Sequence, residues 1–484
     1  MSSWFLPVST LLSHPGERPS QQNVAIAITD GKIDAIAPTD AVSSDTLALP
    51  ALVNAHDHGR GVASFTFGAL DQALELWLPA LKLRPPVSVY ASAALAMAQM
   101  AKGGIGSAVH CHNPGGGDVL EEMRQVCQAA RDVGIRLALA VSMNDRNSLS
   151  YGNRDRLLGL LPAGDRQPIQ SIWEKPMPSV ADQLRLVDEL AADCADDDRI
   201  HIQYGPRGPQ WCSHELLSAI AEASANTGRR VHMHVLETRY QREWADAHYP
   251  QGLITYLDEI GLLSPRFTIA HGAWLTEPEM ELLAERGVIV SVNTSSNLRL
   301  RSGLAPFPQF VKTGVKAAFG LDGMALNDDD DALKELRLNY HLHTQPGIDQ
   351  PLGLADFFSA HRHGGTAVTD RTTLGAIAPG MDADILVLNR QALAADVVPG
   401  LCDEAYLVMA RGAARYVDSL YVAGQPVVQQ GQVVGMDEGA IAHEVQQAMT
   451  HPPDGVYSLQ PLVKTYQTAL TSFYQDQWHC KPES

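Results

Sequence analysis

The sequence lacks a long apolar run, an excess of basic residues and closely spaced cysteines. No run reaches about 18 apolar residues, so we expect no membrane-spanning helix. Residues 1–7 also lack the basic region and long apolar core of a signal peptide. The 36 Lys and Arg against 55 Asp and Glu argue against nucleic acid as a partner, because binding phosphates requires basic surface. A reduced, cytoplasmic protein is indicated by six cysteines without a CxxC pair: Cys111, Cys127, Cys194, Cys212, Cys402 and Cys480.

Between residues 52 and 341 the sequence alternates strand-like and helix-like segments. Apolar runs predict strands at 52–55, 105–110, 135–141, 200–204, 230–235, 267–270, 288–292 and 315–321. Helix-like stretches follow at 88–102, 119–133, 179–194, 213–227, 252–260, 277–286, 307–312 and 330–341. Eight strands alternating with eight helices predict an α/β fold, a parallel (β/α)8 barrel of the TIM type. Its first and eighth strands are then neighbours, and chemistry lies at the carboxyl ends of the strands.

Both ends of the chain carry β-like sequence. Two runs, 24–28 and 33–36, flank an Asp30-Gly31 turn and predict a hairpin, and similar short strands return after residue 373. The ends form either two separate β patches or one small β-sandwich domain built from both. We favour the second, because a sheet at either end alone would leave its edge without a partner. The expected division is 1–50 and 373–438 for the composite β-domain, 51–372 for the barrel and 439–484 for a partly helical tail.

Two further segments fall outside this alternation. Residues 142–178, after the third strand, are rich in Asn, Arg, Gly and Pro and form a candidate lid or a simple insertion. Residues 352–363, after the eighth helix, predict one additional helix.

Five His-x-His pairs occur, and His56 with His58 stands at the end of the first predicted strand. Alternate side chains on a strand point the same way, so these two imidazoles project to one side and can hold one divalent metal ion. The other pairs are His110/His112 and His232/His234 at strand ends, and His341/His343 and His361/His363 in helix-like stretches. Residues two apart on a helix do not face together, so the last two pairs are ordinary histidines in this interpretation.

Side chains at other strand ends complete a candidate metal centre. A mononuclear site needs three or four protein ligands and an open position for water. The strongest set is the first-strand pair, one histidine of the fifth-strand pair and Asp322 at the end of the eighth strand. Glu237, after the fifth strand, can shuttle protons above the metal, and His271 lies at the tip of the sixth. The alternatives are a solvated loop acid for Glu237 and a packed, hydrogen-bonded histidine for His271.

These segments together resemble the amidohydrolase superfamily, most closely the branch with atrazine chlorohydrolase, S-adenosylhomocysteine deaminase and guanine deaminase. They stand in that family's order at 52–58 (LVNAHDH), 232–238 (HMHVLET), 270–272 (AHG), 293–300 (NTSSNLRL), 320–323 (GLDG) and 380–387 (GMDADILV). The resemblance implies one divalent metal ion, zinc or alternatively Fe²⁺. The implied ligands are His56, His58, His234 and Asp322. The implied catalytic residues are Glu237, His271 and Asp322.

Two departures from the family pattern bear on this centre. Two-metal relatives carry a bridging lysine on the fourth strand, but residues 200–204 (IHIQY) contain none, so one metal is expected. The family's usual Thr before the final Asp is Leu321, and its usual Ser-Asn-Asn after it is Leu-Asn-Asp at 326–328. All four expected ligands are present, although the residues around Asp322 differ from the family pattern.

The resemblance implies a hydrolase of carbon–nitrogen bonds other than peptide bonds. It would deaminate a nitrogen heterocycle such as a purine, pterin, pyrimidine or triazine, as metal-bound hydroxide attacks a ring carbon and ammonia leaves. Asp322 would accept the water proton, His271 would orient the attacking oxygen, and Glu237 would protonate a ring nitrogen. The alternatives are hydrolysis of a cyclic amide or carbon–halogen bond at the same site, and a barrel that binds metal without turnover.

Substrate contacts are expected from side chains that follow the strand ends. These candidates are Gln203, Arg207, Trp211, His112, Asn113 and Asn144. Pro206-Arg207 resembles the Pro-Arg of guanine deaminase, where the arginine meets a ring carbonyl, and Trp211 either stacks on the ring or packs at a helix start. The expected partner is a small heterocycle, with no nucleic acid and no membrane, and the expected assembly is a homo-oligomer, a dimer or larger.

Overall fold

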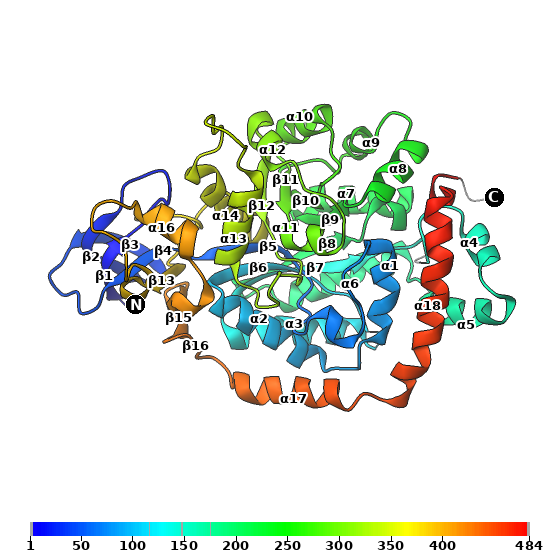
Figure 1. Cartoon of the computed structure of the whole chain (residues 1–484), viewed down its shortest axis with the longest axis horizontal. Coiled ribbons are helices and arrows are strands. Elements are labelled where there is room, and N and C mark those ends of the chain that lie inside the picture. The colour runs from blue at the N-terminus through cyan, green and yellow to red at the C-terminus, as the bar shows by residue number, and fades with distance from the viewer. Residues whose placement is uncertain (1–2, 116, 147–148, 175, 482–484) are drawn as a thin grey trace.

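Eight parallel strands form a barrel that occupies the centre of the molecule (Figure 1). The computed structural model describes residues 3–115, 117–146, 149–174 and 176–481. The barrel strands follow chain order: β5 (Leu52–Asp57), β6 (Ile105–Cys111), β7 (Arg136–Met143), β8 (Ile200–Pro206), β9 (Val231–Val235), β10 (Phe267–His271), β11 (Ile289–Val292) and β12 (Lys316–Phe319). Each lies within two residues of a predicted strand. The first and eighth strands meet as expected, where the Asp322 amide donates to the His56 carbonyl at 2.9 Å.

All eight predicted helices surround the barrel, each within two residues of its expected bounds. They are α2 (Val89–Lys102), α3 (Val119–Val133), α6 (Val180–Asp193), α7 (His214–Thr227), α9 (Leu253–Glu259), α10 (Glu277–Glu285), α12 (Phe307–Thr313) and α13 (Ala332–His343). Local sequence sets their ends: the Ser213 side chain accepts from the Leu216 amide at the start of α7, and Gly228 ends that helix with φ 74°.

Three helices near the catalytic rim were not predicted: α1 (Leu74–Ala80), α8 (Arg239–His248) and α11 (Thr294–Arg299). The α11 sequence, TSSNLR, is rich in residues that compete with helical hydrogen bonding. It is held by buried partners, since Thr294 Oγ1 donates to Asn339 Oδ1 at 2.7 Å and the Ser295 amide donates to Glu335 at 3.1 Å. Tertiary contacts therefore override weak local propensity in this segment.

The 142–178 segment is a packed insertion with two helices, α4 (Arg154–Leu160) and α5 (Ala163–Trp173). Its residues 147, 148 and 175 lie outside the described part of the chain. The long α18 (Asp454–Gln475) runs beside these helices and α1 (Figure 1), and the Trp173 and Tyr466 rings are 5.0 Å apart. The Tyr466 hydroxyl donates to the Leu149 carbonyl. The insertion is thus covered by a segment more than 280 residues later in the chain.

The predicted extra helix is α14 (Leu354–Thr369), which closes the amino-terminal end of the barrel. A side chain at Gly364 would meet Val53 and Ala55 of β5, so the helix backbone comes close to the strands. His361 Nδ1 lies 3.2 Å from the Val53 backbone, and His363 Nδ1 bonds the Ala317 carbonyl at 2.9 Å. This His-x-His pair ties the helix to two strands, at the end opposite the catalytic rim.

The second sheet combines both ends of the chain, in the order β16-β15-β14-β13-β4-β1-β2-β3. Its strands are β1 (Ser3–Leu11), β2 (Gln21–Thr29), β3 (Lys32–Pro38), β4 (Thr46–Pro50), β13 (Ile385–Asn389), β14 (Val417–Val422), β15 (Gln425–Gln429) and β16 (Gln432–Val433). The sheet curls like a sandwich: Trp4 of β1 and Tyr421 of β14 stand 5.2 Å apart although two strands separate them, and neighbouring strands are about 4.8 Å apart. Short helices α15 (Arg390–Leu393) and α16 (Glu404–Arg411) lie beside it.

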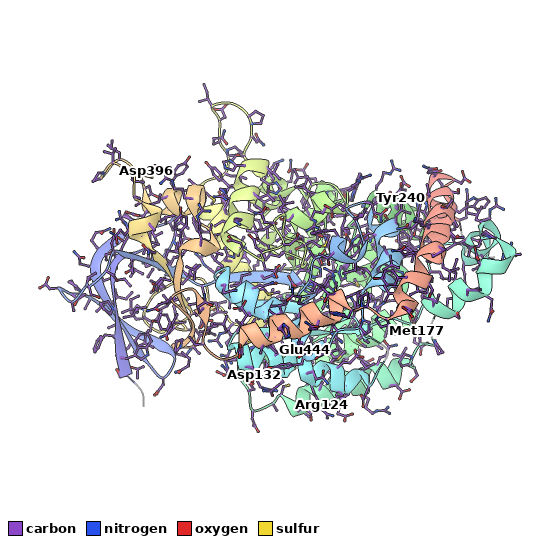
Figure 2. The ribbon with its side chains drawn as sticks, turned by 60° about the horizontal axis from the view of Figure 1, so that its bottom comes forward. Arg124, Asp132, Met177, Tyr240, Asp396 and Glu444 are labelled. Carbon is purple, nitrogen blue, oxygen red and sulfur yellow. The ribbon has the colours of Figure 1, made fainter. Side chains whose placement is uncertain are left out.

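The chain then returns along the barrel through α17 (Glu438–Thr450), which leads to α18. Val445 of α17 packs on Ala91 and Leu95 of α2, and Figure 2 brings this helix to the front with Glu444 labelled on it. Among the described residues, no helix combines the length and apolar character needed to cross a membrane.

Candidate active site

The carboxyl ends of the barrel strands bring the expected ligand atoms to one point. Asp322 Oδ1 lies 3.4 Å from His56 Nε2 and 3.3 Å from His58 Nε2, and His58 Nε2 lies 3.3 Å from His234 Nε2. Zinc bonds to nitrogen and oxygen measure about 2.0–2.1 Å, so tetrahedral ligands of one ion stand about 3.3 Å apart. His56 Nε2 and Asp322 Oδ1 are buried and without a hydrogen-bond partner in the described part of the chain. The four side chains fit one divalent metal ion.

Two of these imidazoles are oriented by hydrogen bonds between Nδ1, the ring nitrogen away from the common point, and a backbone carbonyl. His58 Nδ1 bonds the Cys111 carbonyl and His234 Nδ1 bonds the Arg207 carbonyl, both at 2.9 Å. A carbonyl only accepts, so each Nδ1 carries the hydrogen and each Nε2 lone pair faces the common point. Burial holds the pKa of His58 and of His234 well below the usual value. Both imidazoles are therefore neutral, as metal ligands must be.

The two histidines of the fifth strand occupy different positions. His234 faces the common point, whereas His232 Nε2 lies 2.8 Å from His56 Nδ1, with the two rings stacked 5.0 Å apart. This contact orients the His56 ring in the way that the carbonyls orient its neighbours. The strand pattern left open which histidine is the ligand, whereas the family resemblance implied His234; in the structure His234 lies at the common point and His232 lies behind His56.

Strained backbone marks two residues of the centre. His271 has φ 74° and Asp322 has φ 57°, in the left-handed region that costs a non-glycine residue on the order of 1–3 kcal/mol. A hydrogen bond from the Asp322 amide to the His56 carbonyl holds this conformation. Ser296 Oγ also holds it, by donating to Asp322 Oδ2 at 2.6 Å. These two bonds leave Oδ1 facing the histidines.

A buried carboxyl and a fourth histidine stand next to the ligands. Glu237 Oε2 lies 3.7 Å from His271 Nε2, which lies 4.0 Å from Asp322 Oδ2. His271 Nδ1 lies 2.9 Å from Asn297 Oδ1, and Ser302 Oγ donates to Glu237 Oε1 at 3.1 Å. Burial raises the pKa of Glu237 to about 7. A group that gains and loses its proton near neutral pH suits proton transfer.

Sequence reasoning missed Asp57, the central residue of the first His-x-His pair. Its Oδ1 accepts from the Gly59 amide at 2.6 Å, and its Oδ2 accepts from the Gly323 amide at 2.8 Å and from Asn54 at 2.7 Å. Asn54 also accepts from the Leu321 amide at 2.9 Å. Asp57 and Asn54 therefore join the end of β5 to the loop that carries Asp322. The signal available in the sequence was their place in the 52–58 segment.

Glu75 is a second buried carboxyl that no sequence signal indicated. It lies on α1, and its Oε1 accepts from Thr238 Oγ1 at 2.6 Å and from the Tyr151 hydroxyl. Burial raises the pKa of Glu75, and its charge helps to raise that of Glu237. Glu75 thereby links the insertion, through Tyr151, to the loop that holds Glu237.

Comparison with known proteins agrees with this arrangement. The model of the amidohydrolase family matches residues 47–427, which include the whole barrel. The chain belongs to the amidohydrolase family. This amidohydrolase is 30% identical over 380 residues to a 5′-deoxyadenosine deaminase of Methanothermobacter thermautotrophicus, across 75% of this chain and 80% of that one.

Two solved structures share the fold of this amidohydrolase. An adenosine deaminase from Xanthomonas campestris with bound zinc has a TM-score of 0.72 at 24% identity, covering 94% of this chain and 98% of that one. A mutant of atrazine chlorohydrolase from Arthrobacter aurescens TC1, complexed with zinc and atraton, has a TM-score of 0.74 at 22% identity, covering 92% and 99%. The predicted barrel with a small β-domain is thereby confirmed.

Three of the six expected substrate contacts of the amidohydrolase line a small cavity beside His58 and His234: His112, Asn113 and Arg207. Arg207 Nε donates to Ser142 Oγ at 2.8 Å, and no acidic side chain among the described residues pairs with its guanidinium. Burial lowers the pKa of Arg207. Arg207 thus brings guanidinium donors to this cavity, whereas His112 Nε2 is paired with Glu122 Oε2 at 3.0 Å.

The other three expected contacts lie elsewhere. Gln203 Nε2 donates to the Ala367 carbonyl of α14 at 2.8 Å, so its side chain faces the closed end of the barrel. Trp211 packs on Tyr151 with ring centroids 6.0 Å apart, and Asn144 bonds Met177. None of the three lines the cavity beside the ligands. Gln203 lies three residues before the end of β8, and its Nε2 is turned toward α14 and away from the catalytic rim.

Proposed function

We propose that this chain is a metal-dependent aminohydrolase that removes an exocyclic amino group from a nitrogen heterocycle as ammonia. Its family and its deaminase relative make it a hydrolase of carbon–nitrogen bonds other than peptide bonds. The observation that carries the proposal is the convergence of four ligand atoms, linked by three separations of 3.3–3.4 Å, beside a buried Glu237. The proposed metal is one Zn²⁺, with Fe²⁺ as the alternative, held by His56, His58, His234 and Asp322.

The chain's own residues supply the proton transfers. When bound, the metal would lower the pKa of a coordinated water from about 15.7 towards 7 and make hydroxide available at neutral pH. Asp322 accepts the proton of the attacking water, and His271 orients the oxygen. Glu237 gives a proton to the ring nitrogen, which helps the amino group leave as ammonia. Its pKa of about 7 supports this role, because the carboxyl then holds a proton at neutral pH without holding it too tightly.

The donors beside the metal centre favour a ring that carries a carbonyl group next to the amino-bearing carbon, as in oxopurines, pterins and aminopyrimidinones. Arg207 is partly exposed, and its guanidinium has no acidic partner among the described residues, so its remaining donors can meet a ring carbonyl. Asn113 stands on the same side and offers an amide, whereas His112 Nε2 is already paired with Glu122 Oε2 at 3.0 Å. The 5′-deoxyadenosine named for the relative has no such carbonyl, so adenine-type compounds form the second substrate group.

Three further parts of the proposal rest on the sequence. They are a cytoplasmic location, a homo-oligomeric assembly, and domain boundaries after residues 50, 372 and 438. Support for a reducing location comes from the six cysteines, all of which are free thiols. Support for the division comes from the second sheet, which draws its strands from residues 3–50 and 385–433.

Ammonia release from the zinc-loaded protein tests this function directly. A panel of oxopurines, pterins, aminopyrimidinones, adenine nucleosides, triazines, cyclic amides and halogenated rings should yield ammonia from at least one amino heterocycle, one per molecule consumed. Turnover confined to cyclic amides or halogenated rings would show a different hydrolysis at this site. If metal-replete protein turned over no compound of any class, the chain would be a barrel that binds metal without catalysis.

Arg207→Met should lower kcat/KM on a carbonyl-bearing substrate by about 10–100-fold, because a hydrogen bond from a charged group contributes about 1.5–3 kcal/mol. The loss should appear mainly in KM, since the contact is to a part of the ring that does not react. The control is Arg185→Met, at a side chain with 74% exposure on α6, which should retain wild-type kinetics. An Arg207→Met enzyme with unchanged KM would exclude a substrate contact.

A further inference from the structure

A pair of cysteines lies on the outside of the barrel, between the middle of α3 and the end of α6. Cys127 of α3 and Cys194, which follows α6, have their sulfur atoms 3.9 Å apart, and both side chains are buried. A disulfide requires about 2.05 Å, so the sulfurs need to approach by roughly 1.9 Å (3.9 − 2.05). The two helices are neighbours on the outside of the barrel, which makes this a small local movement.

One of the two sulfurs has a cationic neighbour. Arg131 Nη2 lies 3.6 Å from Cys194 Sγ, while Arg131 Nε donates to Asp197 at 2.8 Å and so fixes the guanidinium in place. The hydrogen bond with Cys127, together with Arg131, lowers the pKa of Cys194. The same bond and burial raise the pKa of Cys127. The Arg131 guanidinium beside Cys194 Sγ favours the thiolate of Cys194, and the thiolate is the reactive form.

Cys194 also borders a cavity, whereas Cys127 does not. The cavity measures about 430 Å³ and lies at the amino-terminal end of β8. Its wall includes the polar side chains of Asp197, His201 and Arg230. A small polar oxidant therefore reaches Cys194 first, and Cys127 stands behind it as the second thiol.

We propose that Cys194 and Cys127 form an oxidisable dithiol that reacts with hydrogen peroxide to give a disulfide between α3 and α6. The Cys194 thiolate attacks one peroxide oxygen, the O–O bond breaks, and the departing hydroxide takes a proton to become water, leaving a sulfenic acid. The Cys127 sulfur then attacks the Cys194 sulfur, and the S–O bond breaks with loss of a second water. In sum, two thiols and one peroxide yield one disulfide and two waters. The product encloses residues 127–194, which contain β7 and the packed insertion.

Peptide mapping of the peroxide-treated, metal-loaded full chain tests the proposal. After blocking of free thiols with iodoacetamide, the Cys127 and Cys194 peptides should appear linked, and dithiothreitol should separate them. In Cys127→Ser, Cys194 should instead trap dimedone as a sulfenic acid. In Cys194→Ser, Cys127 should remain a free thiol. Cys402→Ser, at a cysteine far from the pair in sequence and outside the cavity, should still form the link.

Two arginine variants test whether the link forms because Cys194 is a reactive thiolate or only because the two sulfurs are close. Arg131→Met should slow formation of the link by roughly threefold to tenfold, because each pKa unit changes the thiolate fraction about tenfold. The matched control is Arg124→Met on the same helix (Figure 2), which removes a comparable ion pair, Arg124 to Asp193 of α6, without touching sulfur. Equal rates in both variants, or a wild-type protein whose Cys194 stays unmodified while Cys402 and Cys480 oxidise, would overturn the proposal.

Discussion

Glu237→Gln should lower kcat by roughly 10²–10⁴-fold while the protein keeps its metal. Glutamine has the same shape and can still accept from Ser302, but it has no proton to give to a ring nitrogen. The ligands His56, His58, His234 and Asp322 are untouched by the change. Metal content by mass spectrometry, measured beside steady-state kinetics on the same sample, checks both halves of the expectation.

The matched control is Glu243→Gln. Glu243 lies on α8, where it pairs with Arg239 and His479 away from the ligand cluster. This variant should keep both metal and turnover. If Glu237→Gln also turned over substrate at nearly the wild-type rate, Glu237 would have no role as a proton donor.

The role of Glu237 as proton donor also predicts how kcat/KM of the wild-type enzyme depends on pH. Burial raises the Glu237 pKa to about 7. A raised pKa means that the protonated form, the proton donor, is present below that value and is lost as the pH rises through it. We therefore expect kcat/KM to fall on the alkaline side of about pH 7, and a profile that rises there would contradict the assignment.

His234→Ala should abolish metal binding and activity together, with turnover reduced by at least ~10³-fold, because hydroxide at neutral pH depends on the metal. The imidazole supplies one of four ligands, and its Nδ1 bond to the Arg207 carbonyl aims it at the centre. Removing one ligand leaves three donors around a cavity, with a lower affinity for the ion. The measurement is metal content after dialysis, together with ammonia production.

The matched control for this variant is His214→Ala, at an exposed histidine that begins α7 and contacts Tyr256. It should keep a full complement of metal. A His234→Ala protein that retained one tightly bound ion with wild-type turnover would remove His234 from the ligand set.

The barrel was predictable because most of its strands are short apolar runs with a polar residue close to the rim. The same pattern identified His56, His58 and Asp322 as candidates, since neighbouring strand ends meet in space. The strand pattern alone did not decide between His232 and His234, and only the family resemblance implied His234. The choice depends on which ring contacts His56, and that contact joins residues 176 positions apart.

The parts that the sequence did not reveal depend on distant partners. The α11 helix exists because Asn339 and Glu335 bond its polar side chains. The insertion after β7 is ordered by contacts with α18, at the other end of the chain. Gln203 resembled a substrate residue because it lies near a strand end, but α14 provides its partner at the closed end of the barrel. The local sequence pattern reveals none of these three features, because each depends on residues that are distant along the chain.

The most direct test of the central claim is titration of metal-free protein with Zn²⁺ while ammonia release from an amino heterocycle is followed. The account predicts activity that rises in proportion to added zinc and saturates at one ion per chain. It also predicts that His234→Ala shows no such rise and that Glu237→Gln binds one ion without gaining turnover. Full activity in metal-free protein, or saturation only at two ions per chain, would contradict a deaminase built on this single four-ligand centre.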